Sequence, residues 1–210
     1  MSVDEPLSWV FVLAGLGLLP FALMLTTSFC KYVVVLSLLR SALGSPQVPP
    51  SVVITALAGS LTALTMAPTL NAAWSGAEPE LRRFFEGRDS ARRWDAAHAG
   101  LNAAWAPFES FLRRHTDPED LALLASNAPR PSPLLLIPAF LVSELSAAFR
   151  IAFVIFLPFL AVDLVVANVL MALGMQMMAP TTVSLPLKLL LFSAIDGWRV
   201  LAQGLLGSYA

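Results

Sequence analysis

The sequence predicts an all-α membrane protein that is built from helical hairpins with proline-broken helices. Of the 210 residues, 57% are hydrophobic and only 13% are charged, and the mean hydropathy is +0.74. Globular domains are about 45–50% apolar and about 25% charged, so this composition indicates a membrane protein. The charges are concentrated in the middle of the chain, and a proline interrupts each long apolar stretch.

The distribution of charge predicts three parts. Residues 71–132 contain 8 of the 13 Lys and Arg residues and 9 of the 14 Asp and Glu residues. The flanking residues 1–70 and 133–210 are almost entirely apolar. We therefore expect an N-terminal apolar helical hairpin, a charged helical segment and a C-terminal apolar helical hairpin.

Four apolar stretches are candidates for membrane helices: Trp9–Leu25, Val52–Leu70, Ile151 to about Met178, and Val183–Ile195. A span needs about 20 predominantly apolar residues, and each stretch is short or carries a proline or a charge. Such helices are tolerated where neighbouring protein satisfies the freed backbone groups, so we expect them to pack against other subunits. The first stretch follows the acidic MSVDEP, which is unlike a secretory signal, so we expect it to be retained.

Several charged residues lie within or beside apolar sequence: Lys31, Arg40, Glu144, Arg150, Asp163, Lys188 and Asp196. A charge at the bilayer centre costs at least about 2.5–3.5 kcal/mol and generally faces protein or water. Lys31, Arg40 and Glu144 have an alternative, which is to lie in turns with the charged end in water. We expect polar contacts within or between subunits, and we predict a bridge between Asp163 and Lys188.

The middle segment is predicted to fold into short amphipathic helices. Asp117 and Pro118 precede Glu119 and Asp120, which is typical of a helix N-terminus. Pro107 is expected to divide two helices.

The basic residues of the 26–51 loop favour its placement on the inner side of the membrane, which puts 71–132 outside. Lys and Arg favour the cytoplasmic side mainly in short loops, and residues 71–132 form a segment of about 60 residues. The arginines of this segment are therefore compatible with a position outside.

A cluster of methionines ends the third apolar stretch. The string LMALGMQMMAP (170–180) contains four of the seven methionines, Met171, Met175, Met177 and Met178, together with Gln176, between the loop breakers Gly174 and Pro180. Core gap-filling is one interpretation of such methionines. The other is a gate, because flexible thioethers re-pack around any polypeptide and an apolar constriction resists ion leak by dewetting.

Enzyme, cofactor and nucleic-acid signatures are absent from the sequence. It has no H-E-x-x-H, P-loop, G-x-S-x-G or dinucleotide-binding string. Cys30 is the only cysteine, and the formal net charge of −1 provides no electrostatic case for binding nucleic acid. We therefore expect no catalytic residues, no metal site and no cofactor.

Four long strings match one known family in order and spacing. They are TSFCKYVVVLSLLRSALGSPQVPP (27–50), FLRRHTDPEDLALL (111–124), PAFLVSELSAAFRIAFVIFLPFLAVDLVVANVLMALGMQMMAP (138–180) and SLPLKLLLFSAIDGW (184–198). They resemble the FliP/SctR family (also called YscR or HrcR), the export-gate proteins of bacterial type III secretion. The compact 71–132 segment is more similar to the injectisome (virulence) branch than to the flagellar one.

This resemblance implies a pore-forming subunit of the export apparatus in the bacterial inner membrane, with residues 71–132 in the periplasm. It implies a pentamer that joins two smaller subunits (SctS and SctT, or FliQ and FliR), larger export-apparatus proteins and unfolded secretion substrates. It also implies that the loop after the third apolar stretch forms a gasket. Met175 and Met177 match family methionines, and Gln176 stands where many members have methionine.

Two other functional classes stay open from the residues. A secondary transporter or small ion channel would use Asp163 and Glu144 as proton or cation sites, although no internal repeat is found. An intramembrane enzyme lacks any nucleophile–base or metal set in this sequence.

Overall fold

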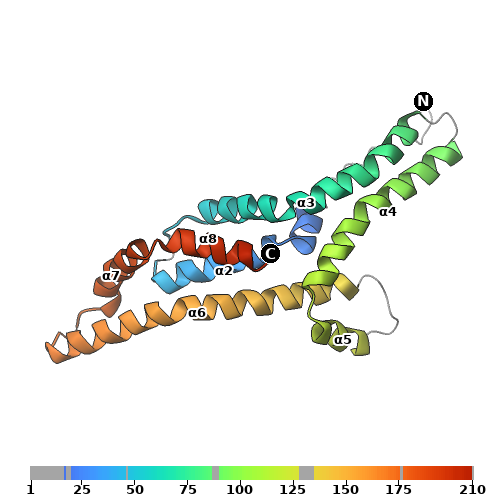
Figure 1. Ribbon diagram of the computed structural model, residues 1–210. Coiled ribbons are helices and arrows are strands. Elements are labelled where there is room, and N and C mark those ends of the chain that lie inside the picture. The colour runs from blue at the N-terminus through green and yellow to red at the C-terminus, as the bar shows by residue number, and fades with distance from the viewer. Residues whose placement is uncertain are drawn as a thin grey trace. The chain divides into compact units, whose positions relative to one another are not determined.

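The structure is a computed structural model, and it describes residues 17, 20–45, 47–86, 90–127, 135–175 and 177–209. Within these residues, all regular structure is helical, which confirms the predicted all-α class. The helices, drawn in Figure 1, are α2 (Phe29–Leu43), α3 (Ser51–Glu86), α4 (Ser90–His115), α5 (Pro118–Asn127), α6 (Leu136–Ala172), α7 (Pro180–Ala194) and α8 (Gly197–Gly207).

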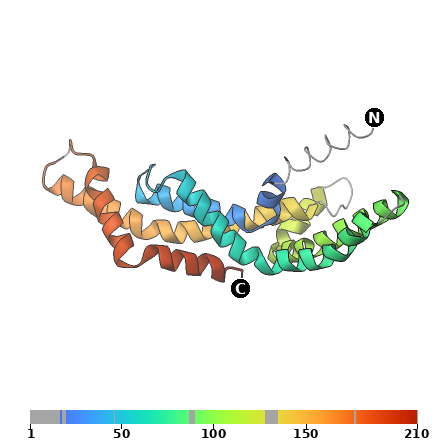
Figure 2. The same ribbon diagram turned by 90° about the horizontal axis from the view of Figure 1, so that it is seen from above.

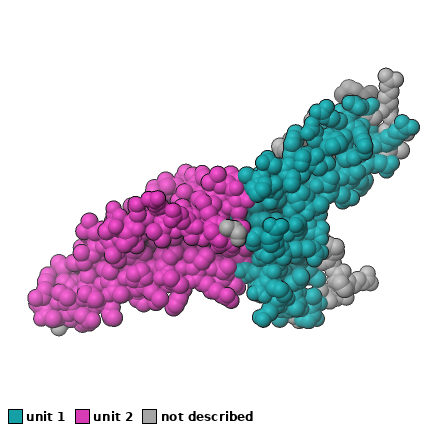
Figure 3. Space-filling view, in the orientation of Figure 1, with its two compact units in different colours: residues 1–30, 66–143 teal, residues 31–65, 144–210 magenta. Residues whose placement is uncertain are grey.

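The chain divides into two compact units, each made of segments that are distant in sequence (Figure 3). Unit 1 contains residues 1–30 and 66–143, and unit 2 contains residues 31–65 and 144–210. The long helices α3 and α6 each contribute to both units. The three-part division by charge stays a prediction, and its second boundary falls outside the described residues.

Two helices, α3 and α6, are long and apolar enough to cross a membrane. Two bent pairs pass the same test together: Pro20–Thr26 with α2, at 82°, and α7 with α8, at 64°. The described helices therefore provide between two and four candidate spans. Most of the first predicted apolar stretch, Trp9–Leu25, lies outside the described residues.

Prolines lie inside continuous helices instead of separating them: Pro68, Pro79, Pro107, Pro158 and Pro186. The expectation that Pro107 divides two helices is wrong, because α4 runs without interruption past it. A proline removes one backbone donor, and packing on both sides can hold the helix together. Ala103 contacts Gly76 on one side of Pro107, and the Phe111 ring lies 5.8 Å from that of Phe140 on the other.

In unit 1, α4 lies alongside the second half of α3 (Figures 1 and 2). Glycines permit this approach, since a Cβ at Gly76 would lie 3.2 Å from the carbonyl oxygen of Ala103. Asp117 caps α5 as predicted, because its carboxylate accepts a hydrogen bond from the Glu119 amide at 2.9 Å. The Ser143 hydroxyl then joins α5 to α6 by donating to Asp120 at 2.7 Å.

In unit 2, α2 lies in the core. It is apolar on nearly all sides and carries Tyr32, Val35, Leu36, Leu39 and Leu43, which are all almost fully buried. The Tyr32 hydroxyl shares a hydrogen bond with Thr65 of α3 at 2.6 Å and donates to the Leu205 carbonyl of α8 at 3.4 Å. These contacts hold α2, α3 and α8 together.

Candidate functional site

The methionine loop, residues 171–179, comprises the last two residues of α6 and the connection to α7. Gly174 has a φ of +75°, which L side chains rarely adopt, and its amide donates to the Met171 carbonyl at 3.0 Å. The Met175 amide donates to the Leu170 carbonyl at 2.9 Å. Pro180 occupies the first turn of α7, where its missing donor has no intrahelical partner to lose. The predicted loop breakers therefore stand just after the end of α6 and at the start of α7.

The methionine side chains of this loop point away from the core of unit 2. Met177 is fully exposed, Met171 is 58% exposed, and Met175 and Met178 are each 41% exposed. Gln176, the other predicted gate residue, lies outside the described residues. These four exposed thioethers, one at the end of α6 and three after it, do not fill gaps in the core of this chain, which leaves them available to another surface.

Lys31 and Glu144 form a buried ion pair between α2 and α6. The Lys31 Nζ lies 3.0 Å from the Glu144 Oε1, and the side chains are only 5% and 2% exposed. The Tyr209 hydroxyl donates a hydrogen bond to the other Glu144 oxygen, and the Lys31 Nζ lies 4.0 Å from the centre of the Tyr209 ring. The Tyr32 ring meets Tyr209 edge to face at 5.7 Å between centroids. The Glu144 carboxylate is thus paired and hydrogen-bonded, as buried charges require.

Sequence reasoning did not identify Tyr209 as part of this cluster. The sequence offered one signal. The chain has only two tyrosines, Tyr32 directly after Lys31 and Tyr209 near the last residue, and both lie in apolar sequence. The pairing itself was not visible, because Tyr209 and Glu144 are 65 positions apart.

A second ion pair joins α6 to α7, the two helices on either side of the methionine loop. The Lys188 Nζ lies 2.6 Å from the Asp163 Oδ2 and donates to the Ala42 carbonyl oxygen of α2 at 3.0 Å. Lys188 is 5% exposed at its side chain and Asp163 is 36% exposed. The predicted inter-helix bridge between Asp163 and Lys188 is therefore present within one chain.

The other predicted polar residues form no ion pair with another described residue. Arg40 is half-buried in the last turn of α2, where a cation complements the helix dipole. Arg150 is exposed on α6. Asp196 is exposed and adopts the left-handed conformation, with φ of 57°, at the bend between α7 and α8. A Cβ at the next residue, Gly197, would lie 2.2 Å from the Phe192 ring, so only glycine fits there.

The charged helices of unit 1 carry ion pairs on their surfaces. Arg82 pairs with Glu78 at 2.7 Å and Arg113 with Glu109 at 2.8 Å, each one helical turn apart. Exposed pairs of this kind contribute little stability and mark a face in contact with water. Among the described residues, no group of His, Cys, Asp and Glu is placed to hold a metal ion.

Comparisons with known proteins point to one family. Residues 12–205 match the model of the FliP family. The chain is 38% identical to the harpin secretion protein HrcR of Erwinia amylovora, over 98% of this chain and 97% of that protein. It is 37% identical to the Yop proteins translocation protein R of Yersinia pestis, over 100% and 99% of the two chains. It is 42% identical to the flagellar biosynthetic protein FliP of Caulobacter vibrioides, over 95% of this chain and 75% of that protein.

Proposed function

This chain belongs to the FliP family, and we propose on that basis that it is a pore-forming subunit of a type III secretion export apparatus. A role in protein export and a place in a membrane complex follow from the family, whose members are structural components and not enzymes. In the proposal, the chain conducts unfolded protein substrates across the bacterial inner membrane. The injectisome branch stays a prediction.

The methionine loop is the observation that carries the proposal. Four exposed thioethers lie in this loop, and the Asp163–Lys188 pair joins α6, which leads into the loop, to α7, which leads out of it. Copies arranged around an axis would bring these loops together into an apolar constriction. Such a constriction resists ion leak by dewetting, and its flexible side chains re-pack around a polypeptide of any sequence.

The exposed apolar surface of the long helices supports assembly with other subunits and with lipid. Only 17% of the most apolar window of α6 and 22% of that of α3 is buried within the chain. Contiguous apolar surface on this scale marks an interaction site. We propose that it is covered in a homo-oligomer, a pentamer by family resemblance, together with the two smaller SctS-like and SctT-like subunits and with bilayer lipid.

The charged helices of unit 1 are proposed to face the periplasm. Their exposed ion pairs favour an aqueous environment. Arg40, in the last turn of α2, favours the cytoplasmic side for the loop between α2 and α3. The charged segment between α3 and α6 then lies on the opposite side of the membrane from the loop between α2 and α3.

The alternative of a transporter or ion channel has less support. Its proposed ion sites, Glu144 and Asp163, are each paired with a lysine at 3.0 Å or less. A carboxylate that already has a cationic partner does not need a second cation, so a structural role in helix packing accounts for both pairs.

The proposal is tested by the native mass of the chain in mild detergent, alone and after co-expression with the SctS-like and SctT-like subunits. We expect a discrete ring of about five copies, which is a closed symmetric assembly that gains mass when the partners are present. A monomer or dimer whose mass ignores those partners would contradict the proposal.

A further inference from the structure

The end of α2 lies against the ion pair that joins α6 to α7 in unit 2. The Lys188 Nζ is 2.6 Å from the Asp163 Oδ2 and donates to the Ala42 carbonyl oxygen at 3.0 Å. Ala42 belongs to the last turn of α2, where carbonyl oxygens have no donor within the helix. A cation at this place also complements the negative end of the helix dipole. Lys188 therefore caps α2 and pairs with α6 at the same time.

Gly44, directly after α2, forms a turn that faces this ammonium. Its φ is +82°, and its amide donates to the Ser41 carbonyl oxygen at 3.1 Å. A Cβ on Gly44 would lie 3.7 Å from the Lys188 Nζ, in van der Waals contact with it. The loop that follows leads to α3, and its residues Gln47 and Val48 are exposed. A surface loop is therefore connected directly to the buried end of Lys188.

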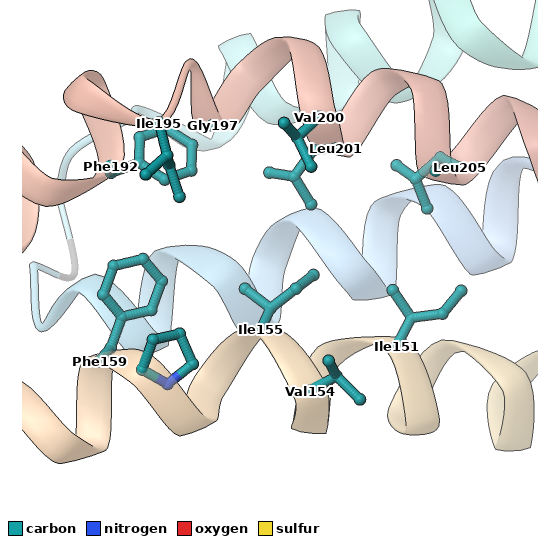
Figure 4. A pocket seen from close by; sticks show the side chains of 12 residues that line it. Ile151, Val154, Ile155, Phe159, Phe192, Ile195, Gly197, Val200, Leu201 and Leu205 are labelled. Atoms are coloured by element: carbon teal, nitrogen blue, oxygen red, sulfur yellow. The ribbon is translucent and has the colours of Figure 1, made fainter.

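Next to the ion pair, the packing between α6 and the bent pair α7–α8 is incomplete. The Phe159 and Phe192 rings are 6.3 Å apart between centroids. Beyond them, an open apolar groove of about 370 Å³ lies between the helices, and Figure 4 shows Ile155 of α6 facing Leu201 of α8 across it. A groove leaves side chains without packing partners on one side. The ion pair is therefore an important tie that holds α7, and with it the methionine loop, against α6.

We propose that the Gly44 turn is a positioning element of the methionine loop and acts on it through Lys188. A partner that displaces the loop between α2 and α3 would draw the ammonium away from Asp163 and loosen the end of the α6–α7 hairpin. The two loops are then coupled, because both bias the position of one side chain. The coupling depends only on contacts within unit 2, whereas its effect on ion leak rests on the proposed gate function.

Two substitutions of nearly equal size separate charge from backbone strain at Gly44. Asp and Asn both adopt the left-handed conformation more readily than most residues. Gly44→Asp places a carboxylate beside Lys188 that competes with Asp163 for the ammonium, and Gly44→Asn places a neutral amide there. Hydrogen exchange of the full-length protein in mild detergent, measured by mass spectrometry, reports on the amides of Gly174 and Met175, which are hydrogen-bonded within the methionine loop.

We expect Gly44→Asp to accelerate exchange in the methionine loop at least about tenfold, because the loss of a hydrogen bond to a charged group has an effect of this size. Gly44→Asn should leave the exchange near the wild-type rate. Exchange of α5, in unit 1, serves as the internal reference and should not change. Melting curves identify any variant that fails to fold.

A double mutant tests whether the effect passes through Asp163. Asp163→Asn removes the carboxylate for which Gly44→Asp competes, so Gly44→Asp should cause no further acceleration in that background. The coupling is also reciprocal. Lys188→Met should therefore accelerate exchange in the last turn of α2, again relative to α5, and this measurement does not need a side chain at Gly44.

Ion conductance of membranes that contain the assembled complex separates the coupling from the gate. Faster exchange together with higher conductance in Gly44→Asp supports both. Faster exchange with wild-type conductance supports the coupling and contradicts the gate. Equal exchange of the methionine loop in the folded Gly44→Asp and Gly44→Asn proteins overturns the coupling, and so do accelerations by Gly44→Asp and Asp163→Asn that multiply. The gate is then still tested by Met177→Ser, which does not involve Lys188.

Discussion

The Lys188 ammonium lies 2.6 Å from the Asp163 carboxylate and joins α7 to α6 on the side of unit 2 from which the methionine loop extends. The same ammonium donates to the Ala42 carbonyl oxygen, so one buried side chain connects three helices. This relationship places the loop at the end of a hairpin whose two helices are tied together.

Removing one member of this pair should destabilise the protein. Lys188→Met removes the ammonium that Asp163 and the Ala42 carbonyl share. We expect a loss of about 3 kcal/mol, the lower end for breaking a buried pair, because part of Asp163 reaches solvent. Urea unfolding in detergent measures this loss. The charge swap Asp163→Lys with Lys188→Asp should recover part of the stability and of the assembly, and a swap that recovers neither would count against the pair.

Tyr209 should contribute to stability through two separable contacts. Tyr209→Phe removes the hydroxyl that donates to Glu144 but keeps the ring beneath Lys31. We expect it to lower the free energy of unfolding by about 1.5–3 kcal/mol, the range for a hydrogen bond to a charged group. Tyr209→Ala also removes the ring contact, so its effect should be larger. Identical melting temperatures for Tyr209→Phe and the wild type would contradict this role.

The bend between α7 and α8 should tolerate no side chain at Gly197. Gly197→Ala brings a Cβ to 2.2 Å from the Phe192 ring, and overpacking of this kind costs about 1–3 kcal/mol. Gly59→Ala is the matched control, with nothing within 4 Å of its Cβ, and should be neutral or stabilising. In a double-mutant cycle, Phe192→Leu should reduce the penalty at Gly197, whereas strict additivity of the two changes would refute the steric explanation.

The methionine loop should control ion leak and not stability. Met177→Ser changes a fully exposed side chain, so the free energy of unfolding should stay within about 0.5 kcal/mol of the wild type. A polar side chain in the constriction admits water, and we expect higher ion conductance of membranes that contain the assembled complex. Met24→Ser, at a 45% exposed methionine outside the loop, is the control. If ion conductance stays at the wild-type level with Met177→Ser, and also with the combined Met175→Ser and Met178→Ser protein, the methionines do not form a gate.

The proposed topology predicts which residues a membrane-impermeant maleimide reaches in cells whose outer membrane is permeable to it. In a Cys30→Ala background, Trp94→Cys lies on the exposed surface of α4 and should be labelled without disruption of the inner membrane. Gln47→Cys, an exposed position in the loop before α3, should be labelled only after that membrane is opened. The opposite labelling pattern would place residues 71–132 in the cytoplasm.

Local features were predictable from the sequence because their physical causes are local. The cap at Asp117 depends on residues two positions apart, and Gly174 and Pro180 impose backbone conformations that end and begin helices. The prediction that Pro107 divides two helices was wrong. Contacts of α4 with α3 and α6, on both sides of this proline, stabilise the helix by more than one missing backbone donor destabilises it.

By itself the sequence determined an all-α membrane protein with a methionine loop and charges that need partners, because composition, helix signals and the free energy of burying a charge are properties of short segments. Only the tertiary structure decided that Lys31 meets Glu144, that Tyr209 hydrogen-bonds to this pair, and that α6 lines an open apolar groove together with α7 and α8. These contacts join residues that are far apart in the chain; Tyr32 and Leu205, for example, are separated by 173 positions. Helical periodicity indicates which face of a helix is apolar, but only packing determines which helix covers it.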